Sequence, residues 1–315
     1  MEGIARKPAW LRIRPPPEGY HRTRDILRAH NLDTVCASAR CPNVGECWGA
    51  GEATFLVLGR VCTRGCRFCA VEKGVPEAPD PTEPERLAEC VAELALSYVV
   101  ITSVTRDDLS DGGAGHIAEC VRAVKKTGAE VEVLVPDFQG DERSIAAVLE
   151  ARPEIYNHNT ETVPRLYKRA RPGGRYERVM SIFRLARQLA PDIPTKSGIM
   201  LGLGETIEEV VAVMHDLREV DVDILTLGQY LRPSNDHLPL DRYYTPDEFH
   251  ALRVEGLAMG YRHVESGPLV RSSYHAWEQV QAAREMGEGR WEKGEGDKTG
   301  AWRGTEEGQE EARTA

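Results

Sequence analysis

The sequence predicts an α/β fold, a partial (β/α)6-type TIM barrel, because two patterns alternate along most of the chain. Short apolar runs separated by amphipathic helical stretches fill residues 53–269, which is typical of βα units built on a parallel sheet. Hydroxyl residues followed three positions later by glutamate mark the starts of several helices. Six or seven such units are fewer than a closed eight-stranded barrel needs, so we expect an open barrel.

Seven segments have the short, apolar character of buried parallel strands. They are residues 53–58, 98–104, 130–135, 154–159, 195–201, 223–230 and 263–267. Three helices between these strands are predicted to begin with a capping box, in which a threonine and a later glutamate bond each other's backbone amides. The pairs are Thr82 with Glu85, Thr206 with Glu209 and Thr245 with Glu248.

Two further regions flank the predicted barrel. Residues 1–52 are an N-terminal extension that carries three cysteines, and residues 53–276 are the barrel with its C-terminal segment. Residues 277–315 are acidic and rich in glycine. Their low apolar content predicts a disordered tail.

Composition narrows the functional class. The formal net charge of −10 argues against a nucleic-acid-binding protein, which normally has a basic face. The sequence has no apolar run long enough to span a membrane and no secretory signal pattern, so we expect a cytoplasmic protein. In a reducing cytosol its eight cysteines would be thiols available for metal binding or catalysis.

Two of these cysteines belong to the core. Cys90 and Cys120 each lie among apolar residues at the spacing of a buried helix face, so we interpret both as core thiols.

The other six cysteines form two triplets. We call Cys36, Cys41 and Cys47 the upstream triplet, and Cys62, Cys66 and Cys69 the downstream triplet. Neither matches the paired spacing of a zinc ribbon, and a group of three thiols can leave an open coordination position for chemistry. The spacing alone leaves three alternatives: iron–sulfur clusters, one shared zinc site, or a redox dithiol formed by Cys66 and Cys69.

The downstream triplet has the spacing CxxxCxxC with an aromatic residue before the last cysteine, and in this respect the sequence resembles the radical S-adenosylmethionine (SAM) superfamily. From residue 33 to 276 it resembles the lipoyl synthase family in particular. The matching segments are CPNVGECW, CTRGCRFC, RDDLSDGGA, NHNTETVPRLYKRARPGGRYER, PTKSGIMLGLGET, ILTLGQYLRPS, HLPLDRY and GPLVRSSYHA. Several long matches in one order are more specific than a single cysteine motif.

The resemblance implies two 4Fe-4S clusters. The three thiolates of the downstream triplet would bind three irons of one cluster and leave its fourth iron for SAM. Phe68 would lie near the adenine of SAM. The upstream triplet would hold an auxiliary cluster, whose fourth ligand in this family is a serine of the RSSY segment. We favour Ser273 over Ser272. A serine alkoxide is a harder ligand than a thiolate, which suits a cluster that is taken apart during the reaction.

The resemblance also implies the reaction. A radical derived from SAM abstracts hydrogen from an octanoyl chain on a carrier-protein lysine, and sulfur from the auxiliary cluster is inserted at C6 and C8. Because those carbons are unactivated, a radical cofactor has to supply the reactivity. Polar residues at the predicted strand ends are then the expected SAM contacts, although each could have an ordinary structural role instead. They are Thr102, Ser103, Asn159, Glu161 and Lys196.

The expected partners follow from the same resemblance. They are octanoylated lipoyl carrier domains, found in the E2 subunits of 2-oxoacid dehydrogenases and in the H protein of glycine cleavage. An electron donor such as ferredoxin or flavodoxin and an iron–sulfur cluster carrier complete the set. A basic cluster could dock an acidic carrier domain or simply be a solvated helix face. It consists of Arg165, Lys168, Arg169, Arg171, Arg175 and Arg178.

Two other functions stay open at this point. Another two-cluster sulfur-inserting radical enzyme, such as a methylthiotransferase, would need an added RNA-binding domain, which the sequence does not show. A non-catalytic iron–sulfur electron carrier would not need polar motifs at so many strand ends.

Overall fold

The computed structural model describes residues 7–13 and 15–285. Seven parallel strands follow one another around the sheet in chain order. They are β2 (Thr54–Val57), β5 (Tyr98–Ser103), β6 (Glu130–Leu134), β7 (Ile155–Asn157), β8 (Thr195–Leu201), β9 (Ile224–Gln229) and β10 (His263–Gly267). All seven predicted strands are therefore confirmed.

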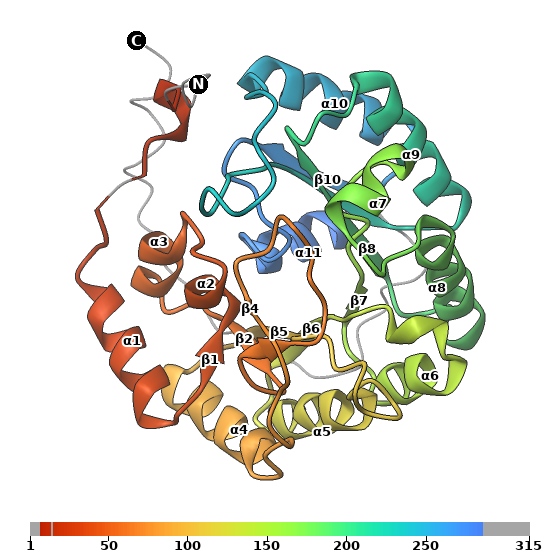
Figure 1. The fold of residues 1–315 in the computed structure, drawn as a ribbon. Helices are drawn as coiled ribbons and strands as arrows, with labels where there is room; N and C mark the ends of the chain where they lie inside the picture. The colour runs from red at the N-terminus through yellow and green to blue at the C-terminus, as the bar shows by residue number, and fades with distance from the viewer. Residues whose placement is uncertain (1–6, 14, 286–315) are drawn as a thin grey trace.

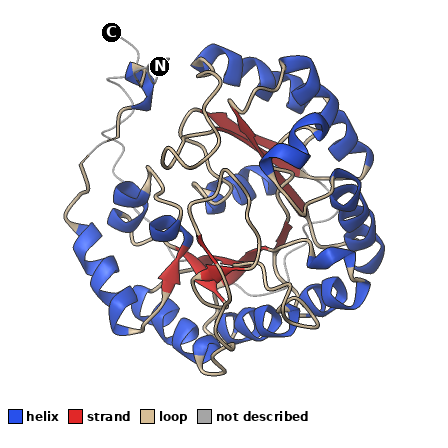
Figure 2. Cartoon of the chain, viewed as in Figure 1, coloured by secondary structure: helices blue, strands red, loops and turns tan. Residues whose placement is uncertain are grey.

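Helices surround this sheet, as Figure 1 shows. The strands line the inside of the ring in Figure 2. The main outer helices are α4 (Glu83–Leu94), α5 (Ala114–Lys125), α6 (Glu142–Glu150), α8 (Tyr176–Leu189), α9 (Ile207–Glu219) and α10 (Pro246–Ala258). Each lies between two consecutive parallel strands, so the predicted partial barrel of six βα units is confirmed.

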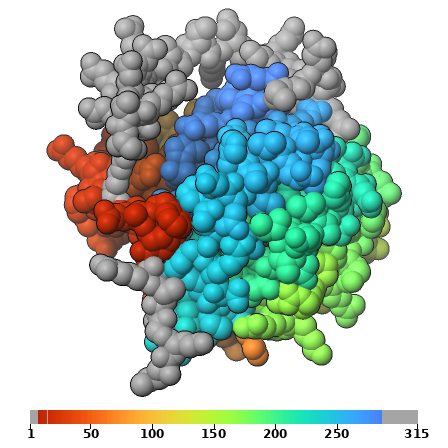
Figure 3. All heavy atoms as spheres, turned by 90° about the horizontal axis from the view of Figure 1, so that it is seen from above, coloured from red at the N-terminus to blue at the C-terminus, as the bar shows by residue number. Residues whose placement is uncertain are grey.

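The barrel is open, because within the described residues its sheet ends at β1 and β10. The short strand β1 (Asp33–Thr34) pairs antiparallel with β2. It belongs to the N-terminal extension, which also contains α1 (Gly19–Ala29), α2 (Val35–Ser38) and α3 (Val44–Gly49). In the space-filling view the N-terminal segment, in red, lies against the C-terminal part of the chain, in cyan and blue (Figure 3).

Several short elements complete the fold. β3 (Val61–Cys62) pairs with β4 (Glu72–Lys73) beside the barrel, and α7 (Tyr167–Ala170) precedes α8. Three 3-10 turns cover Ala9–Leu11, Phe138–Gly140 and Pro164–Leu166.

Two of the three predicted capping boxes are confirmed, at Thr206 of α9 and Thr245 of α10. The third is wrong. Thr82 precedes α4, but its hydroxyl bonds Asp80 Oδ1 at 2.8 Å and caps no amide of the helix. An aspartate two residues before the threonine competes for its hydroxyl, which the spacing rule does not consider.

The predicted disordered tail is wrong for residues 277–285. They belong to α11 (Ala276–Glu285), in which Val280 and Ala283 pack against Ile155 and Ile224 of the sheet. Two apolar residues three positions apart are enough for docking, although the average composition of the tail is polar. The rest of the predicted tail, 286–315, lies outside the described residues.

Cys90 and Cys120 are completely buried, which confirms them as core thiols. None of the helices in the described part of the chain has both the length and the apolar character needed to cross a membrane.

Candidate active site

A cavity of about 350 Å³ lies among the C-terminal ends of the strands and the loops that follow them. Five of the six cysteines in the two triplets line it, all except Cys47. The other predicted site residues on its wall are Phe68, Thr102, Ser103, Asn159, Glu161 and Ser273. The fold thus brings residues from the whole length of the barrel to one chamber, as expected for this end of a parallel barrel.

The loop of the downstream triplet is anchored at its start. The sulfur of Cys62 accepts hydrogen bonds from the amides of Arg64, at 3.4 Å, and Thr105, at 3.3 Å. The buried Arg64 guanidinium contacts the carboxylates of Asp107 and Asp137, each at 2.7 Å. Burial alone would raise the pKa of Asp137, but the arginines beside it outweigh burial and hold that pKa well below its usual range. The ion pairs fix Arg64, and with it the backbone beside Cys62.

The end of the same loop is anchored by two other segments. The Arg67 amide donates to the carbonyl of Ala170 at 2.8 Å, and the Leu238 amide donates to the carbonyl of Arg67 at 2.9 Å. The ring nitrogen Nε2 of His237 donates to the carbonyl of Cys69 at 3.0 Å. The loop is therefore held in place through its backbone, which leaves the thiols facing the cavity.

Burial raises the pKa of the Cys66 and Cys69 thiols, which makes these two groups hard to ionise as free thiols. For Cys69, burial together with smaller contributions from the neighbouring Cys66 and Cys62 raises the pKa to about 12. A redox dithiol needs a readily formed thiolate, so these surroundings disfavour that interpretation of Cys66 and Cys69. Soft thiol donors gathered on one cavity instead fit iron, which as a cation stabilises the thiolate form.

The upstream triplet lies on the other side of the cavity, on the short helical turns of the extension. Cys36 lies in α2, Cys41 in the turn that follows, and Cys47 in α3. Burial raises the pKa of all three, and that of Cys47 is raised further by Cys36 and Cys41. The three sulfurs are thus near neighbours, as ligands of one cluster have to be.

The two serines of RSSY make contacts in different parts of the site. Ser272 exchanges hydrogen bonds with the side-chain amide of Asn159, at 2.8 and 3.0 Å. Ser273 accepts a hydrogen bond from the Thr54 hydroxyl at 2.8 Å. Thr54 also makes hydrogen bonds to the Cys36 thiol, and these oppose the rise in the Cys36 pKa that burial causes. Ser273 therefore shares a neighbour with the upstream triplet, whereas Ser272 faces the end of β7.

The predicted SAM contacts differ in what their polar atoms do. The Thr102 hydroxyl donates to the carbonyl of Leu134 at 2.8 Å, whereas the buried Ser103 hydroxyl has no hydrogen-bond partner among the described residues. Glu161 has a left-handed backbone, with φ of 73°. Burial raises its pKa, while Arg171 opposes the effect. A free hydroxyl, a carboxylate and a guanidinium on one wall fit a zwitterionic cosubstrate with a ribose.

Lys196 does not line the cavity. Its ammonium is fully buried and pairs with Glu132 at 3.0 Å. The same carboxylate accepts hydrogen bonds from Asn157, at 2.8 Å, and Tyr98, at 3.0 Å. This position inside the barrel gives no support to Lys196 as a SAM contact and indicates a structural role.

Two arginines were missed as site residues. Arg171, which we had placed in a basic cluster, lines the cavity and donates to the carbonyl of Asn159 at 2.8 Å. Arg271 also lines the cavity, beside Cys41, and burial lowers its pKa. The available signal for Arg271 was its place in RSSY. For Arg171 it was its place in the matching segment NHNTETVPRLYKRARPGGRYER.

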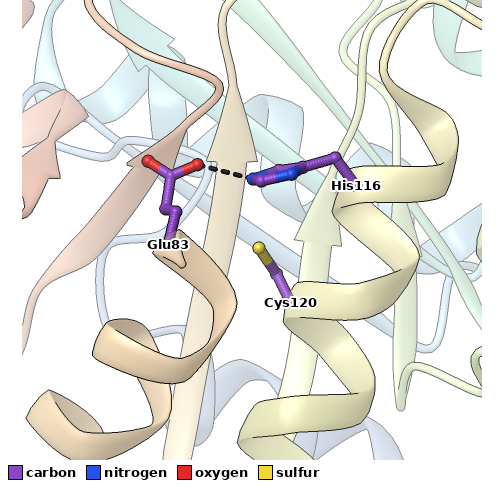
Figure 4. A group of neighbouring side chains, drawn as sticks. All are labelled: Glu83, His116 and Cys120. Atoms are coloured by element: carbon purple, nitrogen blue, oxygen red, sulfur yellow. Dashed lines mark hydrogen bonds and ion pairs between the residues drawn. The ribbon is translucent and has the colours of Figure 1, made fainter. Parts of the chain in front are cut away.

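A separate group of possible ligands lies outside the cavity. The ligand atoms of Glu83, His116 and Cys120 lie within 4.8 Å of one another. Figure 4 shows these three side chains pointing toward one another. One carboxylate oxygen of Glu83 lies 2.6 Å from His116 Nε2 and also accepts the Leu58 amide at 2.9 Å. These contacts already engage the carboxylate, so we interpret the group as a structural support for the end of β2.

Comparison with known proteins agrees with this geometry. The Radical SAM superfamily model matches residues 56–217. The chain is 55% identical to the lipoyl synthase of Koribacter versatilis, over 89% of this chain and 93% of that protein. It is 54% identical to that of Rubrobacter xylanophilus, over 88% of each.

Solved structures are similar in fold alone. Methylornithine synthase (PylB) has a TM-score of 0.51 at 16% identity, covering 86% of this chain and 93% of that one. The hydrogenase maturase HydG has a TM-score of 0.54 at 15% identity, covering 66% and 49%. Taken with the cysteine loop on the barrel cavity and the extent of the sequence identity, these matches show that the chain belongs to the lipoyl synthase family of radical SAM enzymes.

Proposed function

We propose that this chain inserts two sulfur atoms, at C6 and C8, into an octanoyl group carried on a lysine of a lipoyl carrier domain. The observation that carries the proposal is the single cavity lined by the whole downstream triplet and by Cys36 and Cys41 of the upstream triplet. Family membership implies a 4Fe-4S cluster and SAM. We further propose a second 4Fe-4S cluster, held by the upstream triplet and Ser273, as the sulfur donor.

When bound, these groups supply a carbon-centred radical that can abstract hydrogen from an unactivated carbon, and sulfide for the new bonds. The chain's own residues supply placement. The downstream triplet holds the first cluster, while Ser103, Glu161 and Arg171 offer polar contacts to SAM. Phe68 lies on the same wall, where it can pack against the adenine.

The apolar part of the wall suits the octanoyl chain. It includes Leu56, Met200, Leu231 and Val270. An alkyl chain among such residues is shielded from water, and holding the reacting groups close together is a large part of what an enzyme of this kind contributes.

The carrier domains that we propose as substrates are those of E2 subunits and the glycine cleavage H protein. We propose that the reaction takes place in the cytoplasm with a ferredoxin or flavodoxin as electron donor and a cluster carrier that restores the spent cluster.

The test is to change Cys36, Cys41 and Cys47 to alanine together and to reconstitute the protein without oxygen. We expect about eight irons per chain in the unchanged protein and about four in the variant, since each 4Fe-4S cluster carries four irons. The variant should still cleave SAM, measured as 5′-deoxyadenosine, but should form no lipoyl product on an octanoylated carrier peptide, measured by mass. Cys90→Ala is the control, because that thiol is in the core, and should keep both the iron and the product. Lipoyl product from the triple variant would contradict the proposed sulfur donor.

The two serines give a finer test. Ser273→Ala should keep SAM cleavage and lose at least about 10-fold in lipoyl formation, because a ligand that closes the second cluster is gone. Ser272→Ala loses only its bonds to Asn159, so its main effect should be a higher KM for SAM. Measuring KM and kcat for both products separates the two roles. The reverse pattern would assign Ser272 to the cluster.

A further inference from the structure

The loop of the downstream triplet has a second face, on the outside of the barrel. Cys62, Cys66 and Cys69 line the cavity. Thr63, Arg64 and Gly65, between the first two cysteines, line a separate polar hollow that we call the outer groove. Its other walls are Asp107, Gln139, residues 172–175 and Arg178. The loop is thus a thin wall between the cavity and the outer groove.

This wall is one peptide segment thick. Residues 63 and 65 are direct neighbours of the cluster ligands Cys62 and Cys66, and successive Cα atoms are about 3.8 Å apart. The rate of electron transfer falls steeply with distance. An electron that enters from the outer groove therefore has a short path to the proposed radical cluster.

The outer groove is positively charged in an acidic chain. Three arginines line it, namely Arg64, Arg175 and Arg178, against Asp107 on its wall and the buried Asp137 that pairs with two of them, which leaves a small net positive charge. Arg64 and Arg178 are engaged by Asp107 and Asp137, whereas Arg175 is exposed at the start of α8.

More exposed cations lie in the segments that precede or follow the groove residues in the sequence. Arg67 is exposed, and its amide bonds Ala170 directly after the exposed Lys168 and Arg169. Arg165, by contrast, is paired with Glu209. The basic cluster of the sequence therefore divides: Arg171 is buried at the cavity, whereas Arg175 and Arg178 line the outer groove.

We propose that the outer groove is the docking site of the electron donor, an acidic protein that carries a one-electron redox centre. The donor is oxidised by one electron, and the cluster on the downstream triplet is reduced by that electron before each SAM is cleaved. Complementary charge would speed the encounter and orient the partner. The proposal rests on the proposed function only for the identity of the acceptor cluster. An acidic carrier domain fits less well here, because its octanoyl arm has to reach the cavity on the other side of the wall.

The experiment uses reconstituted holoenzyme with Arg175→Glu. The control is Arg184→Glu, which reverses another exposed arginine of α8 that does not line the outer groove. SAM cleavage is measured with reduced flavodoxin and, separately, with dithionite, which needs no docking surface. With flavodoxin, Arg175→Glu should raise the donor KM about 10-fold and weaken its dependence on salt, as expected when a steering charge is reversed. With dithionite, both variants should match the unchanged enzyme.

Three outcomes would overturn the proposal. The donor KM could stay unchanged, the dithionite rate could fall by the same factor as the flavodoxin rate, or the KM for the octanoylated carrier could rise instead. The last outcome would assign the outer groove to the carrier. Because SAM cleavage is the readout, failure to form lipoyl product would count against the proposed function and leave the docking result intact.

Discussion

His158, in the segment after β7, is held in its neutral form by the protein. Its side chain is 1% exposed, and Nδ1 donates to the carbonyl of Val135 at 2.8 Å. Burial, with a smaller contribution from Arg171, lowers its pKa to about 4. A buried imidazolium beside arginines would be costly, so this residue makes the fold sensitive to acid.

The folded pKa of His158 lies below the ordinary value of 6.5. As the pH falls from 6.5 to 4, the unfolded chain takes up a proton that the folded chain does not, and the free energy of unfolding falls by about 3 kcal/mol. Urea unfolding of the unchanged protein and of His158→Asn, from pH 7 to pH 4, measures this. The variant keeps an N–H donor and should lose less stability over that range. Equal losses would mean that His158 does not titrate as described.

At the scale of elements, the residue that follows β2, Leu58, fixes the direction in which the chain enters the downstream-triplet loop. Leu58 has a left-handed backbone, with φ of 68°. The Leu58 amide donates to the Glu83 carboxylate at 2.9 Å, and the Leu58 carbonyl accepts from Arg106 at 3.3 Å. Gly113, at the start of α5, packs against its side chain, so closely that an added Cβ would meet Leu58 Cδ1 at 2.3 Å.

Gly113→Ala should therefore destabilise the protein more than a substitution that introduces backbone strain alone. Gly260→Ala is the matched control, because its φ of 88° is close to the 86° of Gly113, but nothing lies within 4 Å of the new Cβ. We expect a cost of about 1–2 kcal/mol at Gly260 and about 1–3 kcal/mol more at Gly113 from overpacking. Urea unfolding of both variants gives the comparison. Equal costs would show that Leu58 can move aside.

At the scale of elements, periodic patterns were enough to predict the strands. Most residues of strands β2, β5, β6, β7, β8 and β9 are buried, and strands buried on both faces have near-continuous apolar sequences. The errors arose where one contact decided the outcome, as with Asp80 beside Thr82 or the two small apolar residues that dock α11. Average composition and spacing rules do not resolve single contacts.

At the scale of the whole molecule, the N-terminal extension and the C-terminal segment that carries RSSY are joined by hydrogen bonds. Asn43 of the extension donates its side-chain amide to the carbonyl of Leu269 at 2.7 Å. Tyr274 donates to Glu46 at 3.0 Å across the same junction. The upstream triplet therefore lies between the extension and the C-terminal segment that carries RSSY.

Asn43→Ala should loosen this junction. The Leu269 carbonyl would lose its partner in a half-buried place, at a cost of about 1 kcal/mol. We expect a lower urea midpoint and faster proteolysis near residue 270, whereas Asn235→Ala, on an exposed loop, should change neither. Unaltered proteolysis in Asn43→Ala would indicate that other contacts hold the N-terminal extension and the C-terminal segment together.

The candidate site was predictable to different degrees. The triplets follow from spacing and resemblance because their members are close in the sequence. Arg171, Lys196 and the Asn159–Ser272 pair were not predictable in the same way. Asn159 and Ser272 are 113 residues apart, and whether a cation at a strand end faces the cavity or the barrel interior depends on neighbours such as Glu132.

The two serines of RSSY contact different parts of the cavity wall: Ser273 contacts Thr54, and Ser272 contacts Asn159. Adjacent residues cannot shift independently, since their Cα atoms stay about 3.8 Å apart. A displacement of the backbone at Ser273 would therefore also strain the hydrogen bonds between Ser272 and Asn159, so the Thr54 side of the cavity and the end of β7 cannot move independently of each other.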